Sequence, residues 1–326
     1  MSFPNLRLRR LRKTGKIREL LEEVRLSPKD LICPIFVQEN LNSRVQGESM
    51  PGMDRLPLRD VVDEVNSIAE LKIPAIMVFG MPSRKDDKGT SAFAQDGIVQ
   101  RAISEIRKNL GNEIAVITDV CLCQYTTAGH CGLVKGDKID NDSSLETLTK
   151  VAVSQAQSGA DIVSPSAMMD GQVKAIRQGL DDAGFSDVVI MSHSAKHRSS
   201  LYSPFKDMAH SAPKFGDRKT YQLPYTNPKE AMREVETDIA EGVDIVMIKP
   251  ALPYLDLIAM TREKFNVPIS AYSVSGEYAL VKAAAMKGWI DEKEVTLEIL
   301  TAIKRAGADM IVTYFSKSAA KILNEK

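Results

Sequence analysis

The sequence predicts an α/β protein of the (β/α)8 barrel class, the TIM barrel, with an extended N-terminal arm. Eight short apolar runs alternate with helical patterns along the 326 residues. A helix-ending glycine, an aspartate and a β-branched run also recur together at 158–163, 242–248 and 307–312. Such a glycine closes a helix in the left-handed conformation, and the apolar run then enters a buried strand. A doubly wound open sheet is the main alternative.

The individual elements follow from this alternation, because parallel strands need helical crossovers. The predicted strands lie at 31–37, 75–79, 114–119, 161–164, 188–192, 244–249, 268–273 and 309–315. The predicted helices lie at 58–72, 97–110, 144–158, 171–183, 228–241, 252–265 and 295–305.

Two segments fall outside the alternation. Residues 1–30 form a predicted arm, and residues 31–326 form the barrel domain. The basic cluster at 7–13 lacks interleaved aromatic residues, so we interpret it as a solvated arm and expect no nucleic-acid partner. The Ser/Pro/Gly-rich connection at about 198–226 is long enough to be an active-site lid, and its basic residues favour an anionic substrate group.

The overall composition narrows the cellular setting. The formal net charge is zero, no run reaches the ~20 apolar residues of a membrane span, and no N-terminal stretch is typical of a signal peptide. We therefore expect a cytoplasmic protein without a membrane partner. Three of the four cysteines fall within eleven positions, which in a reducing compartment is more typical of a metal or catalytic site than of a disulfide framework.

Two lysines occupy the carboxyl ends of consecutive predicted strands, which is the catalytic face of such a barrel. Lys249 ends the run at 244–249, and Lys196 follows the run at 188–192. Partial burial lowers the pKa of a lysine, and a neighbouring lysine lowers it further, so that the free amine can attack a carbonyl. A single lysine is more often a solvated surface charge, but the pair favours Schiff-base chemistry.

A cysteine motif follows the third predicted strand at the same rim. Cys121, Cys123 and Cys131 could hold one zinc ion and leave its fourth position open, as catalytic zinc sites do. The alternative is a group of small buried thiols. His130 is either a further ligand or a hydrogen-bonding neighbour, and the sequence does not decide between these roles.

Other polar residues fall at this rim. Asp119 could orient a lysine, transfer a proton or cap a turn. Ser275 could bind a carboxylate, although a serine there is often only a helix N-cap. The remaining rim residues are Ser164, Ser166, Tyr272 and Tyr314.

Together these motifs resemble the porphobilinogen synthase (5-aminolevulinate dehydratase) family, from Arg10 to Phe315. The matching strings are the cysteine motif with Gly-His-Cys-Gly at 129–132, Met-Asp-Gly-Gln at 169–172, Gly-Asp-Arg-Lys at 216–219, Met-Ile-Lys-Pro at 247–250, Val-Ser-Gly-Glu-Tyr at 274–278 and Gly-Trp-Ile-Asp at 288–291. The resemblance implies a hydro-lyase of tetrapyrrole (haem) biosynthesis. It would condense two 5-aminolevulinate molecules to porphobilinogen through lysine Schiff bases, with loss of two waters.

The resemblance also implies residue roles. Lys249 would bind the molecule that supplies the propionate side, and Lys196 the second molecule, beside zinc held by the three cysteines. Glu234 aligns with an allosteric magnesium ligand, and the arm would embrace a neighbour in a homo-octamer. The implied substrate ligands are Ser275 and Tyr314 for the first carboxylate, Arg218, Gln222 and Lys206 for the second, with Asp119 and Tyr272 beside them.

One segment, 193–206, departs from the family pattern. Histidine stands at 193 and 197 where the family has Tyr and an aromatic residue, Arg198 replaces Ala, and Lys206 replaces Arg. A lysine offers a carboxylate a point charge instead of a planar fork. An alternative is therefore a homologous Schiff-base condensing enzyme or lyase with a changed second substrate. A non-catalytic zinc-binding barrel is a third possibility.

Overall fold

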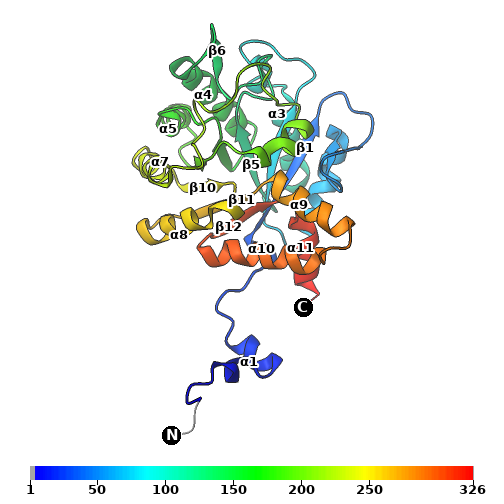
Figure 1. Cartoon of the computed structure of the whole chain (residues 1–326). Coiled ribbons are helices and arrows are strands. Elements are labelled where there is room, and N and C mark those ends of the chain that lie inside the picture. The colour runs from blue at the N-terminus through cyan, green and yellow to red at the C-terminus, as the bar shows by residue number, and fades with distance from the viewer. Residues whose placement is uncertain (1–3, 326) are drawn as a thin grey trace.

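Eight parallel strands close into a barrel in the computed structural model, which describes residues 4–325 (Figure 1). The last strand pairs with the first, and this closure excludes the open sheet. All eight predicted strands are present, although the fifth runs on to Lys196 and the eighth ends at Thr313. They are β1 (Leu31–Gln38), β4 (Ala75–Met81), β5 (Ala115–Val120), β8 (Ile162–Pro165), β9 (Val189–Lys196), β10 (Ile245–Lys249), β11 (Ile269–Ser273) and β12 (Met310–Thr313).

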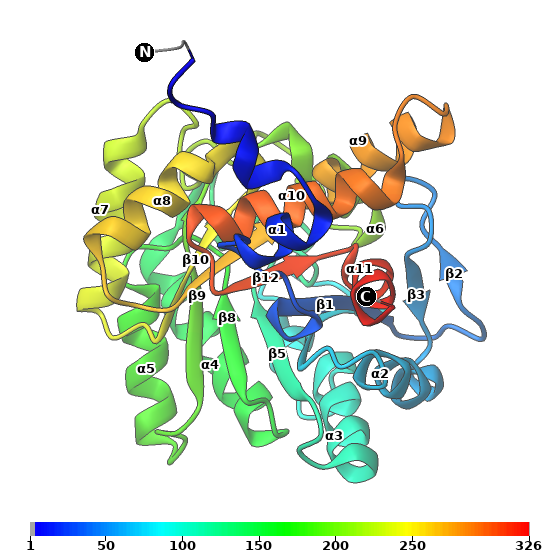
Figure 2. The ribbon, with the colours of Figure 1, turned by 90° about the horizontal axis from the view of Figure 1, so that it is seen from below.

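Helices surround these strands (Figure 2). The seven predicted ones are α2 (Val61–Ala69), α3 (Ile98–Leu110), α4 (Asn141–Gln157), α5 (Gln172–Asp182), α7 (Pro228–Ala240), α8 (Leu255–Lys264) and α10 (Glu292–Ala306). Among the elements that were not predicted are two helices, each of which begins within three residues of the end of a strand, and two hairpins. They are α9 (Ser275–Met286), α11 (Ser316–Asn324), the hairpin of β2 (Val45–Gln46) with β3 (Asp54–Leu56), and the hairpin of β6 (Leu133–Lys135) with β7 (Lys138–Asp140).

The recurring glycine–aspartate motif has a structural function at the start of the strands. Gly159, Gly242 and Gly307 have φ between 97° and 122°, a backbone conformation that favours glycine. Each following aspartate accepts a hydrogen bond from a backbone N–H at the start of the neighbouring strand, and each also pairs with an arginine. The carboxylates are those of Asp161, Asp244 and Asp309, the N–H donors are Val116, Ile190 and Ile269, and the arginines are Arg107, Arg177 and Arg262. These hydrogen bonds and ion pairs therefore stabilise the amino ends of the barrel strands.

Side chains alternate between the barrel interior and the layer under the helices. In β1, Ile32 and Phe36 belong to the interior cluster, whereas Ile35 and Val37 pack in the outer cluster. The interior also contains the aromatic rings of Phe79 and Tyr272. These rings lie toward the carboxyl ends of their strands, where they surround the candidate site.

The arm and the lid occupy opposite parts of the molecule. The described part of the arm carries η1 (Leu8–Arg12) and α1 (Gly15–Leu20), and it projects away from the barrel, while its residues 1–3 lie outside the described residues (Figure 1). The basic cluster at 7–13 is exposed, as predicted. Segment 198–226 contains η5 (Ser200–Tyr202) and α6 (Ser203–Met208). Within residues 4–325, no helix combines the length and the apolar character needed to cross a membrane.

Candidate active site

The two predicted lysines lie side by side at the carboxyl ends of neighbouring strands. Lys196 of β9 and Lys249 of β10 are register partners, and their side chains are buried, with 5% and 7% exposed. Both line one cavity. The other lining residues that the sequence had singled out are Asp119, Cys121, Cys123, Ser166, Lys206, Arg218, Ser275 and Tyr314.

Lys249 has an aromatic environment. Its Nζ lies 4.0 Å from the centroid of the Tyr272 ring, and the rings of Tyr202 and Phe205 lie within 5.7 Å. Burial, followed by repulsion from Lys196, lowers the pKa of Lys249 to about 7. A large fraction of this amine is therefore unprotonated near neutral pH, which a nucleophile toward a ketone requires.

Lys196 has a polar environment. Its Nζ donates a hydrogen bond to the carbonyl oxygen of Ser166. The hydroxyl of Ser166 donates to Asp119 Oδ1 at 2.6 Å, and Gln124 donates to the other carboxylate oxygen. Burial raises the pKa of Asp119, and the charge of Lys196 opposes this rise. Asp119 is thus placed to exchange a proton beside both amines.

The three cysteines converge as the metal-site prediction requires. The Sγ atoms of Cys121, Cys123 and Cys131 lie within 4.8 Å of one another, and Cys121 and Cys123 are 3.4 Å apart. Tetrahedral zinc with bonds of about 2.3 Å needs sulfur atoms about 3.8 Å apart. The thiols are buried, free and adjacent to the lysine cavity, so their donor set and spacing fit a zinc ion.

His130 takes the hydrogen-bonding role of the two that the sequence left open. Its Nδ1 lies 3.0 Å from the hydroxyl of Tyr221, and its Nε2 lies 3.0 Å from the carbonyl oxygen of Phe215. Both ring nitrogens are therefore engaged, and His130 holds the lid against the cysteine loop. It does not belong to the cysteine cluster.

The lid closes over the lysines. The hydroxyl of Tyr202 donates to the carbonyl oxygen of Lys249 at 3.2 Å, and the Phe205 ring packs tilted against Phe36 and edge-on against Phe79. Ser275 accepts a hydrogen bond from the backbone N–H of Phe205. The cavity between the lid and the lysines measures about 30 Å³, which is room for about one or two waters.

Ser275 is the first residue of α9 and not its N-cap, which is Val274. Its hydroxyl donates to the carbonyl oxygen of Leu201, so it joins the lid to the barrel in the closed state. Tyr314, behind it, shares a hydrogen bond of 2.9 Å with the hydroxyl of Tyr272. Three hydroxyl groups therefore gather on the Lys249 side of the cavity.

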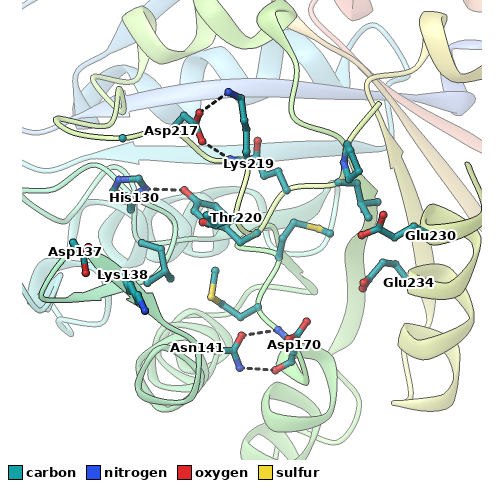
Figure 3. A pocket seen from close by; sticks show the side chains of 18 of the residues that line it. His130, Asp137, Lys138, Asn141, Asp170, Asp217, Lys219, Thr220, Glu230 and Glu234 are labelled. Atoms are coloured by element: carbon teal, nitrogen blue, oxygen red, sulfur yellow. Dashed lines mark hydrogen bonds and ion pairs between the residues drawn. The ribbon is translucent and has the colours of Figure 1, made fainter. Parts of the chain in front are cut away.

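Two of the predicted residues lie elsewhere. Gln222 and Glu234 line a larger neighbouring cavity of about 710 Å³, between α7 and the loops that follow β5 and β8 (Figure 3). Glu230 and Glu234 project into it from α7, and Asp170 lies across from them. Burial, reinforced by the neighbouring carboxylates, raises the pKa of Glu234 to about 7. This cavity carries negative charge that a cation would neutralise.

Glu277 supports the site and was not predicted. It is 3% exposed, and its carboxylate accepts hydrogen bonds from the N–H groups of Ala251, Leu252 and Val274. It thereby holds the chain just beyond Lys249. The sequence contained a signal, since a glutamate two residues after Ser275 can return to the backbone at a helix start. Tyr202 and Phe205 were also missed, because an isolated aromatic residue in a lid has no periodic pattern.

The fold and the cavity together define a class of protein. It is a (β/α)8-barrel enzyme with two adjacent buried lysines that could attack a carbonyl group, beside a cysteine cluster that could hold a metal. The family follows from comparison with known proteins. The delta-aminolevulinic acid dehydratase family model matches residues 5–322, so the chain belongs to this family.

Individual relatives support the same assignment. The chain is 53% identical to a delta-aminolevulinic acid dehydratase of Archaeoglobus fulgidus over 98% of its own length and 99% of the relative's, and 51% identical to one of Bacillus subtilis over 98% of both. The crystal structure of the Toxoplasma gondii enzyme with its product porphobilinogen superposes with a TM-score of 0.96 and 43% identity. That superposition covers 98% of this chain and 92% of the other. The predicted barrel, family and hydro-lyase activity are confirmed.

Proposed function

We propose that Lys249 and Lys196 each bind one molecule of 5-aminolevulinate, and that the site condenses the two to porphobilinogen. The amine of Lys249 attacks the ketone of the first molecule and expels water, which leaves an imine. The observation that carries this assignment is the surroundings of Lys249: a buried amine with a pKa of about 7, next to a second buried lysine. Lys196 forms the corresponding bond with the second molecule.

The carboxylates of the two substrate molecules are bound by different groups, the first by hydroxyl groups and the second by basic residues. Ser275 and Tyr314 line the Lys249 side, and we assign them to the first carboxylate once the lid hydrogen bonds of Ser275 are exchanged for substrate. Arg218 and Lys206 come from the lid and neutralise the second carboxylate. Gln222 lies in the adjoining cavity and reaches the substrate only with a shift of the lid.

Cys121, Cys123 and Cys131 hold zinc in this proposal. Bound zinc would supply a Lewis acid for the oxygen of the second substrate. Asp119 holds and returns protons between the lysines, and Tyr272 supports Lys249. The closed lid excludes water from the imine, which would otherwise hydrolyse.

The carboxylates around Glu234 suit magnesium. Hard cations prefer oxygen ligands, and binding would offset the repulsion that, after burial, raises the pKa of Glu234. We expect magnesium to raise the melting temperature of the protein and to lose this effect in E234Q, measured by calorimetry. An equal rise in both proteins would contradict the assignment.

The oligomer and the compartment complete the proposal. Apolar side chains of the arm (Leu6 and Leu20) and of the end of α9 (Met286 and Trp289) are 76% to 80% exposed, which supports burial against other subunits in a homo-octamer. Four free cysteines support a reducing, cytoplasmic setting.

One experiment tests the function and separates it from a changed second substrate. Labelled 5-aminolevulinate is supplied alone, with and without a chelator, pyrrole is measured with an aldehyde reagent, and imines are trapped with borohydride for peptide mapping. The proposal predicts pyrrole without chelator and label on Lys249 and Lys196. Label on Lys249 alone, without pyrrole, would instead favour a condensing enzyme or lyase with another second substrate.

A further inference from the structure

His193 is a buried polar residue of the barrel interior to which the chemistry above gives no role. It lies on β9 and is 0% exposed, and neither Nδ1 nor Nε2 has a hydrogen-bond partner among the protein atoms. Buried polar groups without partners are rare, because each one destabilises the fold unless a partner is supplied. The imidazole of His193 therefore requires a hydrogen-bond partner at this position.

A bulge in β9 aims His193 toward the site. The register of β9 with β10 pairs Ser192 with Val246 and then Ala195 with Ile248, so two residues of β9 oppose one of β10. Side chains alternate along a regular strand, and residues three apart would face opposite sides. The bulge allows His193 and Lys196 to face the interior together.

His193 contacts the ring that supports Lys249. Its ring packs edge-to-face on Tyr272, with centroids 6.3 Å apart and an interplanar angle of 63°. Lys249 Nζ lies over the same Tyr272 ring. Burial and the charges of Lys249 and Lys196 lower the pKa of His193 well below its usual range, so the imidazole is neutral. It can therefore accept at one nitrogen and donate at the other.

A second unpartnered group faces the interior two residues before Tyr272 on β11. Ser270 of β11 is 0% exposed, and its Oγ has no hydrogen-bond partner within residues 4–325. It is register partner of Met247, the residue opposite the bulge, and it shares the interior face with Tyr272 two residues later. His193 of β9 and Ser270 of β11 therefore both enter the interior beside Tyr272, from the two strands that flank β10.

We propose that His193 is a positioning residue for Lys249: with Ser270 it holds a buried water beneath Tyr272, and this fixes the ring on which the Lys249 amine rests. A water with two or three polar partners satisfies the unpartnered atoms. The inference rests on the proposed role of Lys249. It assigns a function to one of the residues at which this chain departs from its family.

The test compares four variants in steady-state turnover and in the single-turnover rate at which borohydride traps 5-aminolevulinate on Lys249. H193F removes both nitrogens, H193Q restores an amide donor and acceptor, S270A removes the other partner, and M191L is an apolar interior control on the same strand. We expect H193F to lower kcat and the trapping rate about tenfold, which corresponds to ~1.4 kcal/mol, with KM changed less than twofold.

The remaining variants make the expectation specific. H193Q should recover most of the loss, S270A should reproduce it, and H193F/S270A should lose no more than H193F, because one water serves both residues. M191L should resemble the wild type. Wild-type trapping rates in folded H193F or in S270A, additive losses, or an equal loss in M191L would overturn the role of His193. Absence of label on Lys249 in the wild type would instead overturn the proposed function, and this inference with it.

Discussion

The two lysines have the same side chain and lie next to each other, yet their surroundings differ. The Lys249 amine rests on the Tyr272 ring without a hydrogen-bond partner among the described residues, whereas the Lys196 amine donates to the carbonyl oxygen of Ser166 beside Asp119. Aromatic burial leaves an amine reactive, because nothing has to be broken before it attacks. A hydrogen-bonded amine has to exchange its partner first. The comparison suggests an order of reaction in which Lys249 engages substrate before Lys196.

Removing each amine in turn should have the largest effect and tests the difference between the two lysines most directly. K249M should lower pyrrole formation by on the order of 10⁴-fold or more, as loss of a covalent nucleophile does elsewhere. K196M should also abolish pyrrole but still trap 5-aminolevulinate on Lys249. Mass spectrometry after borohydride reduction measures both. Label on Lys196 in K249M at the wild-type rate would contradict the proposed order.

Removal of zinc should have the second largest effect on pyrrole formation. Chelation should lower pyrrole formation by about 10²–10³-fold, with recovery on adding zinc, while trapping on Lys249 persists. C131S should behave like the chelated enzyme. C33S is a matched control, because Cys33 is also a buried thiol but neither lines the lysine cavity nor belongs to the three-cysteine group. Full activity with no zinc measurable by atomic absorption would exclude the metal role.

The pH dependence of trapping should separate the effects of burial and of charge. The reactive form of Lys249 is the free amine, so the trapping rate should rise with pH up to about 7 and level off above it. The charge of Lys196 contributes to this low pKa after burial. K196M should therefore shift the rise to higher pH, and an unchanged profile would show that burial alone lowers the pKa.

The fold could be predicted because its signals are local. Glycine and aspartate mark the entrances of three strands, and the apolar runs between them are long enough to identify. Helices α9 and α11 were missed because only one or two residues separate each of them from its strand, and none of these residues is a Gly, Pro, Asn or Asp that would mark a turn. The boundary of β9 was misplaced for another reason. The polar run Ser192–Lys196 ends the apolar pattern, but pairing with β10 continues through the bulge.

The site was predictable where a residue lies at the end of a strand. Lys196, Lys249 and Asp119 meet because parallel strands end at one rim. Residues on the lid and beyond it could be placed only by tertiary contacts. Glu277 is one example, since its three backbone donors come from two separate loops. Gln222 is the opposite example, since it lies near the site in sequence but lines the neighbouring cavity.

The smallest expected effect is on the apparent KM, and it follows from a substitution at Lys206 of the lid. Lys206 and Arg218 line the cavity together, and Lys206 offers the second carboxylate a single ammonium. K206R would add a planar fork, so we expect the apparent KM to fall by about three- to tenfold with little change in trapping on Lys249. K219R is the matched control, because Lys219 lies on the same lid but pairs with Asp217 and lines the other cavity. An equal fall in KM for both variants would indicate a general effect of lid charge and not a contact with the second substrate.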